Sequence, residues 1–175
     1  WGPADPEHVK EFSVVGYVFG EKIHEVTGIP IGLVQSAHGG STAEAWLDRT
    51  VLERFGGFDL ELTPAKTDPV WYAVLPTVLY NRMLAPLLPM SVKGVIWYQG
   101  ESNRPNPTQY RALMPAFVKM LRERWAQGGL PFYYVQIAPY RYDGPNAISG
   151  ALLREAQLHN LKDIPSSGMA VTLDI

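Results

Sequence analysis

The sequence contains no cysteine, so disulfide bonds, zinc–thiolate sites and catalysis by a thiol are excluded. It also lacks a long apolar run, since no stretch approaches the roughly 20 residues that a helix needs to cross a bilayer. Charge of one sign is not in excess either, because the formal net charge is −2. This balance predicts neither nucleic acid nor an anionic membrane as a partner. No cofactor and no metal site are expected.

An initiator methionine is missing, because the chain opens on Trp1 and continues with two early prolines, Pro3 and Pro6. At the other end the chain stops on an apolar strand pattern at Ile175. Both ends predict that the chain is a fragment of something longer. Its 175 residues, with 46% apolar and 18% charged side chains, suit a folded single domain over residues 1–175.

Helical and strand patterns alternate along the chain. Apolar residues at helical spacing predict helices, and short β-branched or aromatic runs predict strands. The order of these elements predicts an α/β fold with a parallel sheet covered by helices on both faces. The expected elements are helix 6–27, strand 29–35, a helix starting at 43, helix 51–55, helix 75–88, strand 92–98, helix 109–125 capped by Thr108, strand 132–138, helix 148–161 and strand 168–173.

The stretch 92–103 combines a buried strand with a polar ending. Its first part, 92–98, is apolar and typical of a central strand buried on both faces. It then ends in the amide, carboxylate and hydroxyl groups of Gln99, Glu101, Ser102 and Asn103. Ligands of open α/β sheets bind in the crevice outside the carboxyl ends of the strands, so we expect chemistry here.

A second polar loop, residues 36–42, follows the expected strand 29–35. Its glycine pair, Gly39 and Gly40, lets backbone N–H groups approach a ligand without interference from Cβ atoms. Ser41 or Thr42 would cap the helix that follows, whose free N–H groups favour an oxyanion. The alternative is a tight turn that needs glycine for its shape alone, and the spacing does not choose between the two.

Several sequence blocks, spread in one order along nearly the whole chain, carry a family resemblance. They are Phe12-Ser13-Val14-Val15-Gly16-Tyr17, Pro30-Ile31-Gly32-Leu33-Val34, Gly39-Gly40-Ser41 with Ala45-Trp46, Leu79-Tyr80-Asn81-Arg82-Met83, Gly94-Val95-Ile96-Trp97-Tyr98-Gln99-Gly100-Glu101-Ser102-Asn103 and Arg154-Glu155-Ala156-Gln157. Together these blocks resemble the sialate O-acetylesterase family of SGNH-type hydrolases, which includes carbohydrate acetylesterases. The resemblance implies a three-layer α/β/α, flavodoxin-like fold and the removal of O-acetyl groups from sugars by a serine nucleophile.

The resemblance also implies roles for individual residues. Gly40 matches the glycine whose backbone N–H helps to hold the oxyanion. Gln99 or Asn103 matches the amide that supplies another oxyanion donor, and Gln99 is favoured. Glu101 would orient or charge-stabilise the catalytic histidine. The residues that would contact the substrate are Asn103, Gly39, Ser41 and His38.

The family's nucleophile and histidine blocks have no counterpart in the sequence. The nucleophile would lie in a Gly-Gln-Ser-Asn-Met-like block upstream of Trp1, and the histidine in an Asp-Ile-His-Pro-like block just after Ile175. We therefore expect this polypeptide to be inactive by itself and to work with the remainder of its parent chain. The resemblance further implies an O-acetylated carbohydrate, either sialic acid or a polysaccharide, as the substrate, and a secreted or periplasmic location.

Two alternatives remain open. In the first, Ser102 is the nucleophile, because residues 100–104 partly resemble the Gly-x-Ser-x-Gly elbow of α/β-hydrolases. The second glycine is missing, however, and Pro105 and Pro107 oppose an immediate helix. In the second alternative, the chain is a non-catalytic carbohydrate-binding module or pseudoenzyme. Its stacking faces, which could equally be core residues, would be Trp46, Trp71, Trp97 and Tyr98.

Overall fold

The computed structural model describes residues 2–61, 72–142, 144 and 147–173. The chain divides into two compact units, Trp1–Ala37 and His38–Ile175. That the two units form the single domain expected over residues 1–175 stays a prediction.

In the first unit the structure describes helix α1 (Val14–Thr27). Ser13 caps this helix, because its hydroxyl accepts a hydrogen bond from the Gly16 N–H at 3.2 Å. Gly28 ends the helix with a φ of 69°, in the left-handed region that glycine adopts freely. The expected start at residue 6 is wrong. The chain is irregular before the cap at Ser13, and residues 6–12 form turns and bends.

The strand expected over residues 29–35 is not formed. In the part of this unit that the structure describes, no other strand is present with which the segment could pair. Ile29, Ile31 and Val34 are exposed instead of packed. Because ladder hydrogen bonds and the burial of alternate side chains stabilise a strand, a β-branched pattern alone does not create one.

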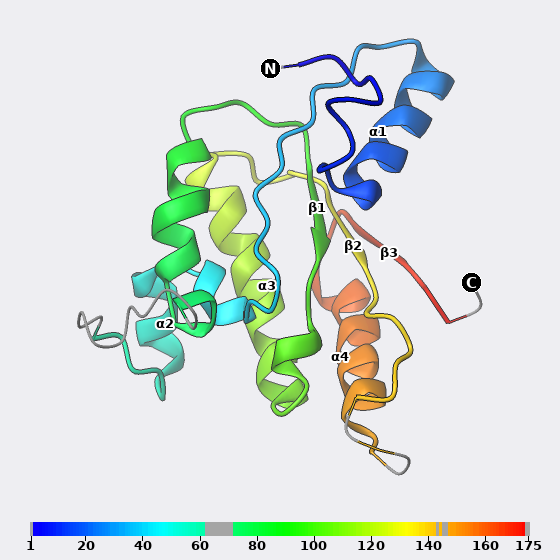
Figure 1. Cartoon of the computed structure of the whole chain (residues 1–175). Coiled ribbons are helices and arrows are strands. Elements are labelled where there is room, and N and C mark those ends of the chain that lie inside the picture. The colour runs from blue at the N-terminus through cyan, green and yellow to red at the C-terminus, as the bar shows by residue number, and fades with distance from the viewer. Residues whose placement is uncertain (1, 62–71, 143, 145–146, 174–175) are drawn as a thin grey trace. The chain divides into compact units, whose positions relative to one another are not determined.

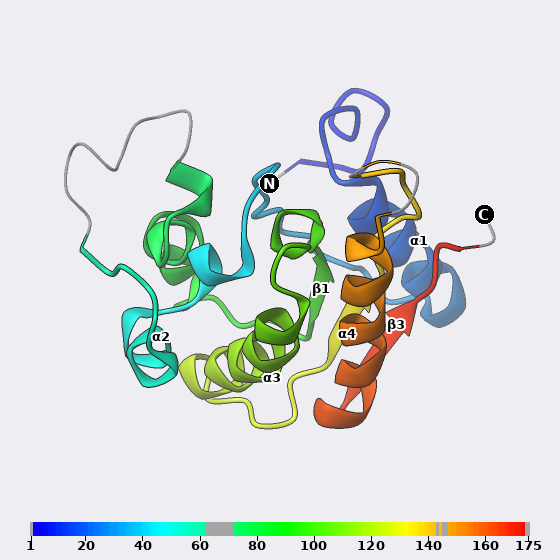
Figure 2. The same ribbon diagram turned by 90° about the horizontal axis from the view of Figure 1, so that it is seen from below.

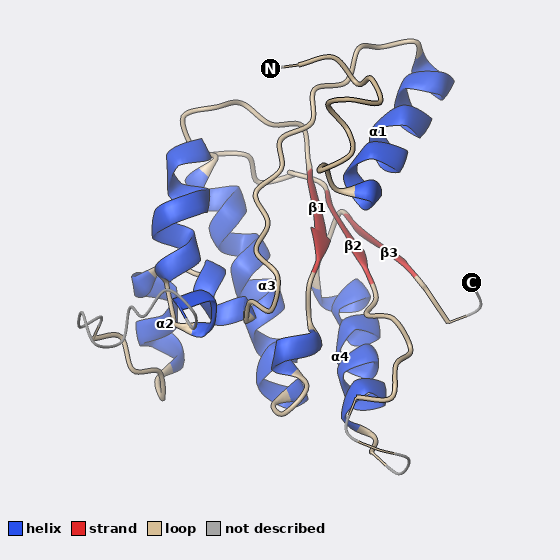
Figure 3. Cartoon of the chain, in the orientation of Figure 1, coloured by secondary structure: helices blue, strands red, loops and turns tan. Residues whose placement is uncertain are grey.

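The second unit is built on a three-stranded parallel sheet of β1 (Val95–Tyr98), β2 (Phe132–Val135) and β3 (Ser167–Ala170). Val95 lies opposite Phe132, and Phe132 lies opposite Ser167. The α/β class with a parallel sheet is confirmed, as Figure 3 shows by element type. The strands are shorter than expected, and among them β2, not β1, is central.

Within its described residues, the second unit also contains three α-helices: α2 (Arg49–Phe55), α3 (Pro107–Arg124) and α4 (Ser149–Asp163). Figures 1 and 2 show α3 and α4 side by side on one face of the sheet. α3 begins at Pro107, so Thr108 is not its cap as expected. Proline is favoured at the first helical position because the N–H that it lacks would have no partner there.

The helix expected over residues 75–88 is irregular. A π-helical turn, Tyr80–Leu84, passes into a 3-10 turn, Ala85–Leu87. Pro86 lies in the second turn and has no N–H to donate, so a regular α-helix cannot continue through it. The expected helix starting at residue 43 is likewise a single 3-10 turn, Ala43–Trp46.

The core lies between the sheet and α3. Trp97 of β1 contacts Phe117 of α3, with ring centroids 4.7 Å apart, and Phe117 contacts Phe132 of β2 at 6.1 Å. Each buried aromatic ring of this kind stabilises the fold by about 2–3 kcal/mol. On the opposite face, Tyr98 is 47% and Tyr133 43% exposed. The prediction that the first strand is buried on both faces is therefore wrong, because the helices of this unit cover one face.

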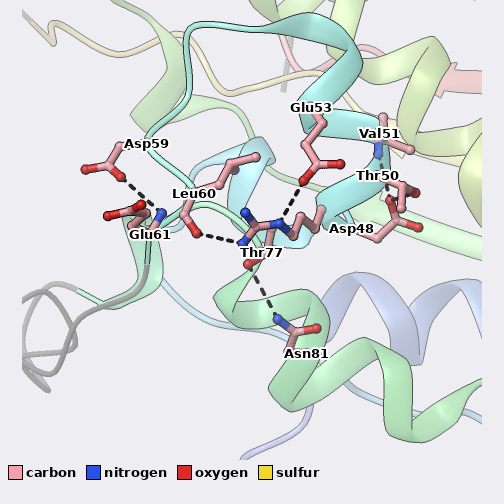
Figure 4. A network of polar contacts seen from close by, with 10 residues as sticks. Asp48, Thr50, Val51, Glu53, Asp59, Leu60, Glu61, Thr77 and Asn81 are labelled. Atoms are coloured by element: carbon pink, nitrogen blue, oxygen red, sulfur yellow. Dashed lines mark hydrogen bonds and ion pairs between the residues drawn. The ribbon is translucent and has the colours of Figure 1, made fainter.

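A set of polar contacts surrounds α2 (Figure 4). The Asp48 carboxylate caps this helix by accepting from the Val51 N–H and the Thr50 hydroxyl, both at 2.8 Å. Arg49 pairs with Glu53 at 2.8 Å on the exposed side of the helix. Asp48 is also paired with Arg124 at the end of α3, so it ties two helices together.

Candidate functional site

Two polar loops meet at the carboxyl end of β1. The Ser102 hydroxyl donates to the Gly40 carbonyl at 2.9 Å, and Gln99 Nε2 donates to the Ser41 carbonyl at 2.9 Å. These contacts join segments that are 62 and 58 positions apart in the sequence. The polar loop 36–42, in its part from residue 38 onwards, and the turn 99–103 are separate features of the sequence but form one site.

Asn103 is the centre of this site. Its Oδ1 accepts from the Ala43 N–H at 2.8 Å and from Gln99 Nε2 at 2.7 Å, while its Nδ2 donates to Glu44 Oε2 at 2.8 Å. A backbone N–H only donates and a carboxylate only accepts, so the two neighbours fix the orientation of this amide. The Asn103 residue is 4% exposed, which makes each of these hydrogen bonds costly to lose.

Gln99 has its orientation fixed in the same way. Both hydrogens of its Nε2 are used, one on the Ser41 carbonyl and one on Asn103 Oδ1. In this arrangement Gln99 holds the two loops together, and it can donate to an oxyanion only by exchanging one of these bonds. Asn103 Nδ2 donates to Glu44 and has a second hydrogen. The choice of Gln99 over Asn103 as the oxyanion donor stays a prediction.

The hydroxyls of Ser41 and Thr42 do not cap the turn Ala43–Trp46. The Ser41 hydroxyl accepts from Trp46 Nε1 at 3.0 Å, and the Thr42 hydroxyl donates to the Val74 carbonyl at 3.3 Å. Thr42 does occupy the N-cap position, but it makes no side-chain capping bond, because both hydroxyls are engaged elsewhere. Gly40 has a φ of 72°, which explains the need for glycine at this position. The oxyanion role of its N–H stays a prediction.

Gly100 allows the chain to turn sharply after Gln99. Its φ is 156°, and a Cβ at this position would lie 2.8 Å from both Ile137 Cγ2 and Leu153 Cδ2. The turn is therefore packed tightly against the end of β2 and against α4. Only glycine fits here, so the direction in which Glu101 and Ser102 leave the sheet is fixed by the backbone.

Glu101 and His38 lie on the two loops without joining the amide network. Burial, and after it the nearby charge of Glu101, raise the pKa of Tyr98 above its usual value of 10.0. His38 Nδ1 is 3.0 Å from the carbonyl oxygen of Gly39, and its ring meets the ring of Tyr72 edge-on at 4.9 Å. The expected roles of Glu101 towards a histidine and of His38 towards the substrate stay predictions.

The described ranges hold neither a candidate metal cluster nor a helix that could span a bilayer. No group of three or more histidine, aspartate or glutamate side chains there could hold a metal ion. None of the helices in those ranges is both long and apolar enough to cross a bilayer. What the site does offer is a buried set of amide and backbone groups that hold one another in fixed positions.

The sequence matches the family model for carbohydrate esterase, sialic acid-specific acetylesterase, over residues 4–175. The chain belongs to this family. The sialate O-acetylesterases of Pongo abelii and Homo sapiens are each 31% identical to it over 184 residues, which is 96% of this chain and 34% of each relative. The chain thus spans about a third of the length of these curated relatives.

A solved structure extends the likeness to three dimensions. The crystal structure of a carbohydrate acetylesterase from Xanthomonas citri matches this chain with a TM-score of 0.86 and 38% sequence identity. The match covers 100% of this chain and 38% of that one. The family and the fold class inferred from the sequence blocks are therefore confirmed.

Reading the family's sequence blocks does not reveal every residue that holds the esterase-family site together. Glu44 was missed, although its carboxylate orients the Asn103 amide. Tyr110 and Gln157 were missed too, and both donate to the Gln99 carbonyl at 3.2 Å. Burial raises the pKa of Tyr110, so this hydroxyl remains a neutral donor. Gln157 does belong to the block 154–157, which was the one available signal.

Of the tryptophans that a carbohydrate-binding module would use, the two that the structure describes, Trp46 and Trp97, pack in or against the core. Trp46 is 3% exposed and packs edge-on against Trp97, with ring centroids 5.8 Å apart. A buried ring offers no face to a sugar, so the stacking role is wrong for Trp46. Tyr98 is exposed. Trp71 lies outside the described residues.

Proposed function

We propose that this chain supplies the oxyanion-supporting part of a carbohydrate O-acetylesterase site. The observation that carries the proposal is the buried amide network, in which Asn103 and Gln99 tie the Gly40 loop to the end of β1. Acyl transfer from an acetyl ester places negative charge on the carbonyl oxygen, and preorganised N–H donors stabilise that charge. Removing one such donor typically costs about 3 kcal/mol of transition-state stabilisation.

The nucleophile and the catalytic histidine are proposed to lie outside these residues. Two contacts support this view. The Ser102 hydroxyl donates to the Gly40 carbonyl, which leaves its proton away from any base. His38 Nδ1 faces the Gly39 carbonyl and not a serine. A serine nucleophile needs a hydrogen-bonded base, and neither of these two contacts joins a serine to a histidine.

The proposed substrate is an O-acetylated carbohydrate, such as an acetylated sialic acid or polysaccharide. The reaction would break the ester bond through a serine acyl-enzyme and release acetate when water attacks it. The names of the relatives support this substrate class. A secreted or periplasmic location is a further proposal that follows only from this substrate class, and fractionation and immunodetection of the natural protein would test it. The remainder of the parent chain is the proposed partner of this segment.

Acetate release tests the proposed function. The product of the complete reading frame should release acetate from O-acetylated sialic acid or acetylated xylan, and a serine-directed inhibitor should abolish the activity. The 175-residue chain alone should not hydrolyse p-nitrophenyl acetate. Inhibitor-sensitive turnover by the chain alone would show that the nucleophile lies within it.

Ser102→Ala in the complete product separates the proposal from the alternative nucleophile. We expect this variant to keep its esterase activity, because Ser102 bonds the Gly40 carbonyl and not a base. Loss of the acyl-enzyme step with substrate binding intact would instead identify Ser102 as the nucleophile. Trapping with the inhibitor and mass spectrometry of the labelled peptide would report the same distinction directly.

A further inference from the structure

The ladder between β1 and β2 stops one hydrogen bond short of the turn at Gly100. The last pair in register is Tyr98 with Val135, so an unbroken ladder would place Gly100 opposite Ile137. The Val95 N–H donates to the Pro131 carbonyl at 2.9 Å, and in a parallel ladder one strand then bonds at every second residue. The next hydrogen bond would therefore run from the Ile137 N–H to the Gln99 carbonyl.

A side chain of α4 occupies the place of that hydrogen bond. The Ile137 N–H donates to Gln157 Oε1 at 3.0 Å, and Gln157 Nε2 donates to the Gln99 carbonyl at 3.2 Å. A carboxamide carries the same acceptor and donor as a peptide group. Both strand ends thus keep a partner while they stand apart by the width of an amide group.

The inserted amide is held rigidly. Gln157 is 1% exposed, and its own backbone carbonyl accepts from the Tyr134 hydroxyl at 2.8 Å. One turn earlier on α4, the Arg154 carbonyl accepts from Gln136 Nε2 at 3.0 Å. Two residues at the end of β2 therefore fix α4 where Gln157 enters the sheet. The close approach of Gln157 Nε2 to the Cβ position of Gly100, 3.3 Å, shows that the turn is shaped around this amide.

We propose that Gln157 is a positioning residue, whose side-chain amide separates the ends of β1 and β2 and thereby sets the position of Gln99. The Gln99 side chain bonds the Ser41 carbonyl and Asn103, so a shift of its backbone moves the loop that carries Gly40. The catalytic consequence rests on the proposed esterase function. The structural part of the proposal does not rest on that function. The structural part and the catalytic part are therefore tested by different measurements.

The structural part is tested in the unmodified 175-residue chain by NMR. Scalar couplings across hydrogen bonds correlate an amide proton with the carbonyl carbon that accepts it. With labelled glutamine, the Ile137 N–H should correlate with the side-chain carbonyl carbon of Gln157. A correlation with the backbone carbonyl of Gln99 would show a continuous ladder and overturn the proposal. This measurement needs neither activity nor a variant.

The catalytic part is tested with Gln157→Glu in the complete reading-frame product. A protonated carboxyl can still donate to the Gln99 carbonyl and accept from Ile137, whereas the ionised form faces that carbonyl with no proton. Burial raises the pKa of such a carboxyl, so the protonated form persists towards neutral pH. We expect kcat to fall about 100-fold at alkaline pH, with KM little changed, because the site is displaced and not removed. The ratio of the variant's kcat to the wild-type kcat should rise again as the pH is lowered.

Two further variants complete this test. Gln157→Leu has no proton to regain, so its loss of kcat should not depend on pH. Gln127→Glu is the matched control, because Gln127 Nε2 donates to the Val92 carbonyl at 3.2 Å, before the start of β1. It should keep the wild-type kcat. Two results would overturn the catalytic part. One is a ratio of Gln157→Glu kcat to wild-type kcat that does not change with pH, and the other is the same loss and recovery of kcat in Gln127→Glu. If the wild-type product releases no acetate, the proposed function fails while the NMR result stands.

Discussion

Two polar networks of the second unit differ in nearly every respect. The contacts that join the two loops of the candidate site link residues 58 to 62 positions apart, and its central groups, Gln99 and Asn103, are buried neutral amides. The network around α2 (Figure 4) mostly joins residues two to four positions apart. It includes exposed charged side chains, as in the pair of Arg49 with Glu53.

The difference shows what each network can do. An exposed local ion pair contributes about 0–1 kcal/mol because water and salt screen it. A buried amide that loses a partner leaves a donor or acceptor without solvent, at about 1–3 kcal/mol for each group. The site network therefore fixes the position of two distant loops, whereas the α2 network adjusts the ends of one helix. Asp48 combines features of both networks. It is buried and charged, and it is paired with Arg124, which lies 76 positions away in the sequence.

The largest effect is expected at the centre of the buried network. Asn103→Leu removes the partners of the Ala43 N–H, of Gln99 Nε2 and of Glu44. We expect the free energy of unfolding to fall by about 4 kcal/mol, as measured by urea denaturation. Asn106→Leu is the control, since Asn106 is exposed and makes no side-chain cap bond at the start of α3. Equal losses in both variants would contradict the special position of Asn103.

Gly100→Ala should give the second-largest loss in the free energy of unfolding. The added Cβ would meet two side-chain carbons at 2.8 Å, and alanine strongly disfavours a φ of 156°. The expected loss is about 3 kcal/mol in the free energy of unfolding. Gly128→Ala provides the comparison, because no atom lies within 4 Å of a Cβ there, and it should leave the urea midpoint nearly unchanged.

Asp48→Asn tests the intermediate case. Burial alone would raise the pKa of Asp48, but the hydrogen bonds from Arg124, Val51 and Thr50 outweigh it and lower the pKa below the usual 3.8. A lowered folded-state pKa means that the carboxylate stabilises the fold above about pH 4, and that this contribution is lost as the pH falls through the folded-state value. The variant should cost about 2 kcal/mol at pH 7. The gap to wild type should close in acid, as followed by urea titrations from pH 7 to pH 3.

The smallest effect belongs to the exposed pair. Arg49→Ala removes the contact with Glu53 and a hydrogen bond to the Leu60 carbonyl at 3.1 Å. Both partners are more than half exposed, so the free energy of unfolding should change by less than about 0.5 kcal/mol. Thermal unfolding at low and high salt would measure it. A loss comparable to that of Asn103→Leu would remove the distinction between the two networks.

The parallel sheet could be predicted from the sequence because its strands are short apolar runs that alternate with helical patterns, and side chains of β1 and β2 pack in or against the core. Val95, Trp97, Phe132 and Tyr134 carry that signal. Residues 29–35 have a similar β-branched pattern but no partner strand within the described residues, and pairing is not encoded locally. The order of the strands in the sheet could not be predicted from the sequence either. The sequence pattern predicts β1 as the central strand, whereas β2 lies between β1 and β3.

The candidate site was predictable where polar residues follow an apolar strand. Gln99 and Asn103 were found in this way, and so was the glycine loop at Gly40. Glu44 and Gln157 were not, because each acts through a hydrogen bond to a residue about 60 positions away, and such a bond leaves no periodic pattern. Ser102 shows the limit of this reasoning, since a serine after a strand suggested an alternative nucleophile, whereas its hydroxyl donates to the Gly40 carbonyl.

The amide of Gln157 also bears on the order in which the chain folds. A ladder hydrogen bond closes as soon as neighbouring strands are in register, but this one depends on a side chain 20 residues beyond Ile137 and 58 beyond Gln99. It can form only after α4 has docked, so the loop-closure entropy must be overcome first. The carboxyl edge of the sheet should therefore close late in folding. In the folded chain, the Ile137 N–H should exchange with solvent through opening of α4 and not through fraying of the strands.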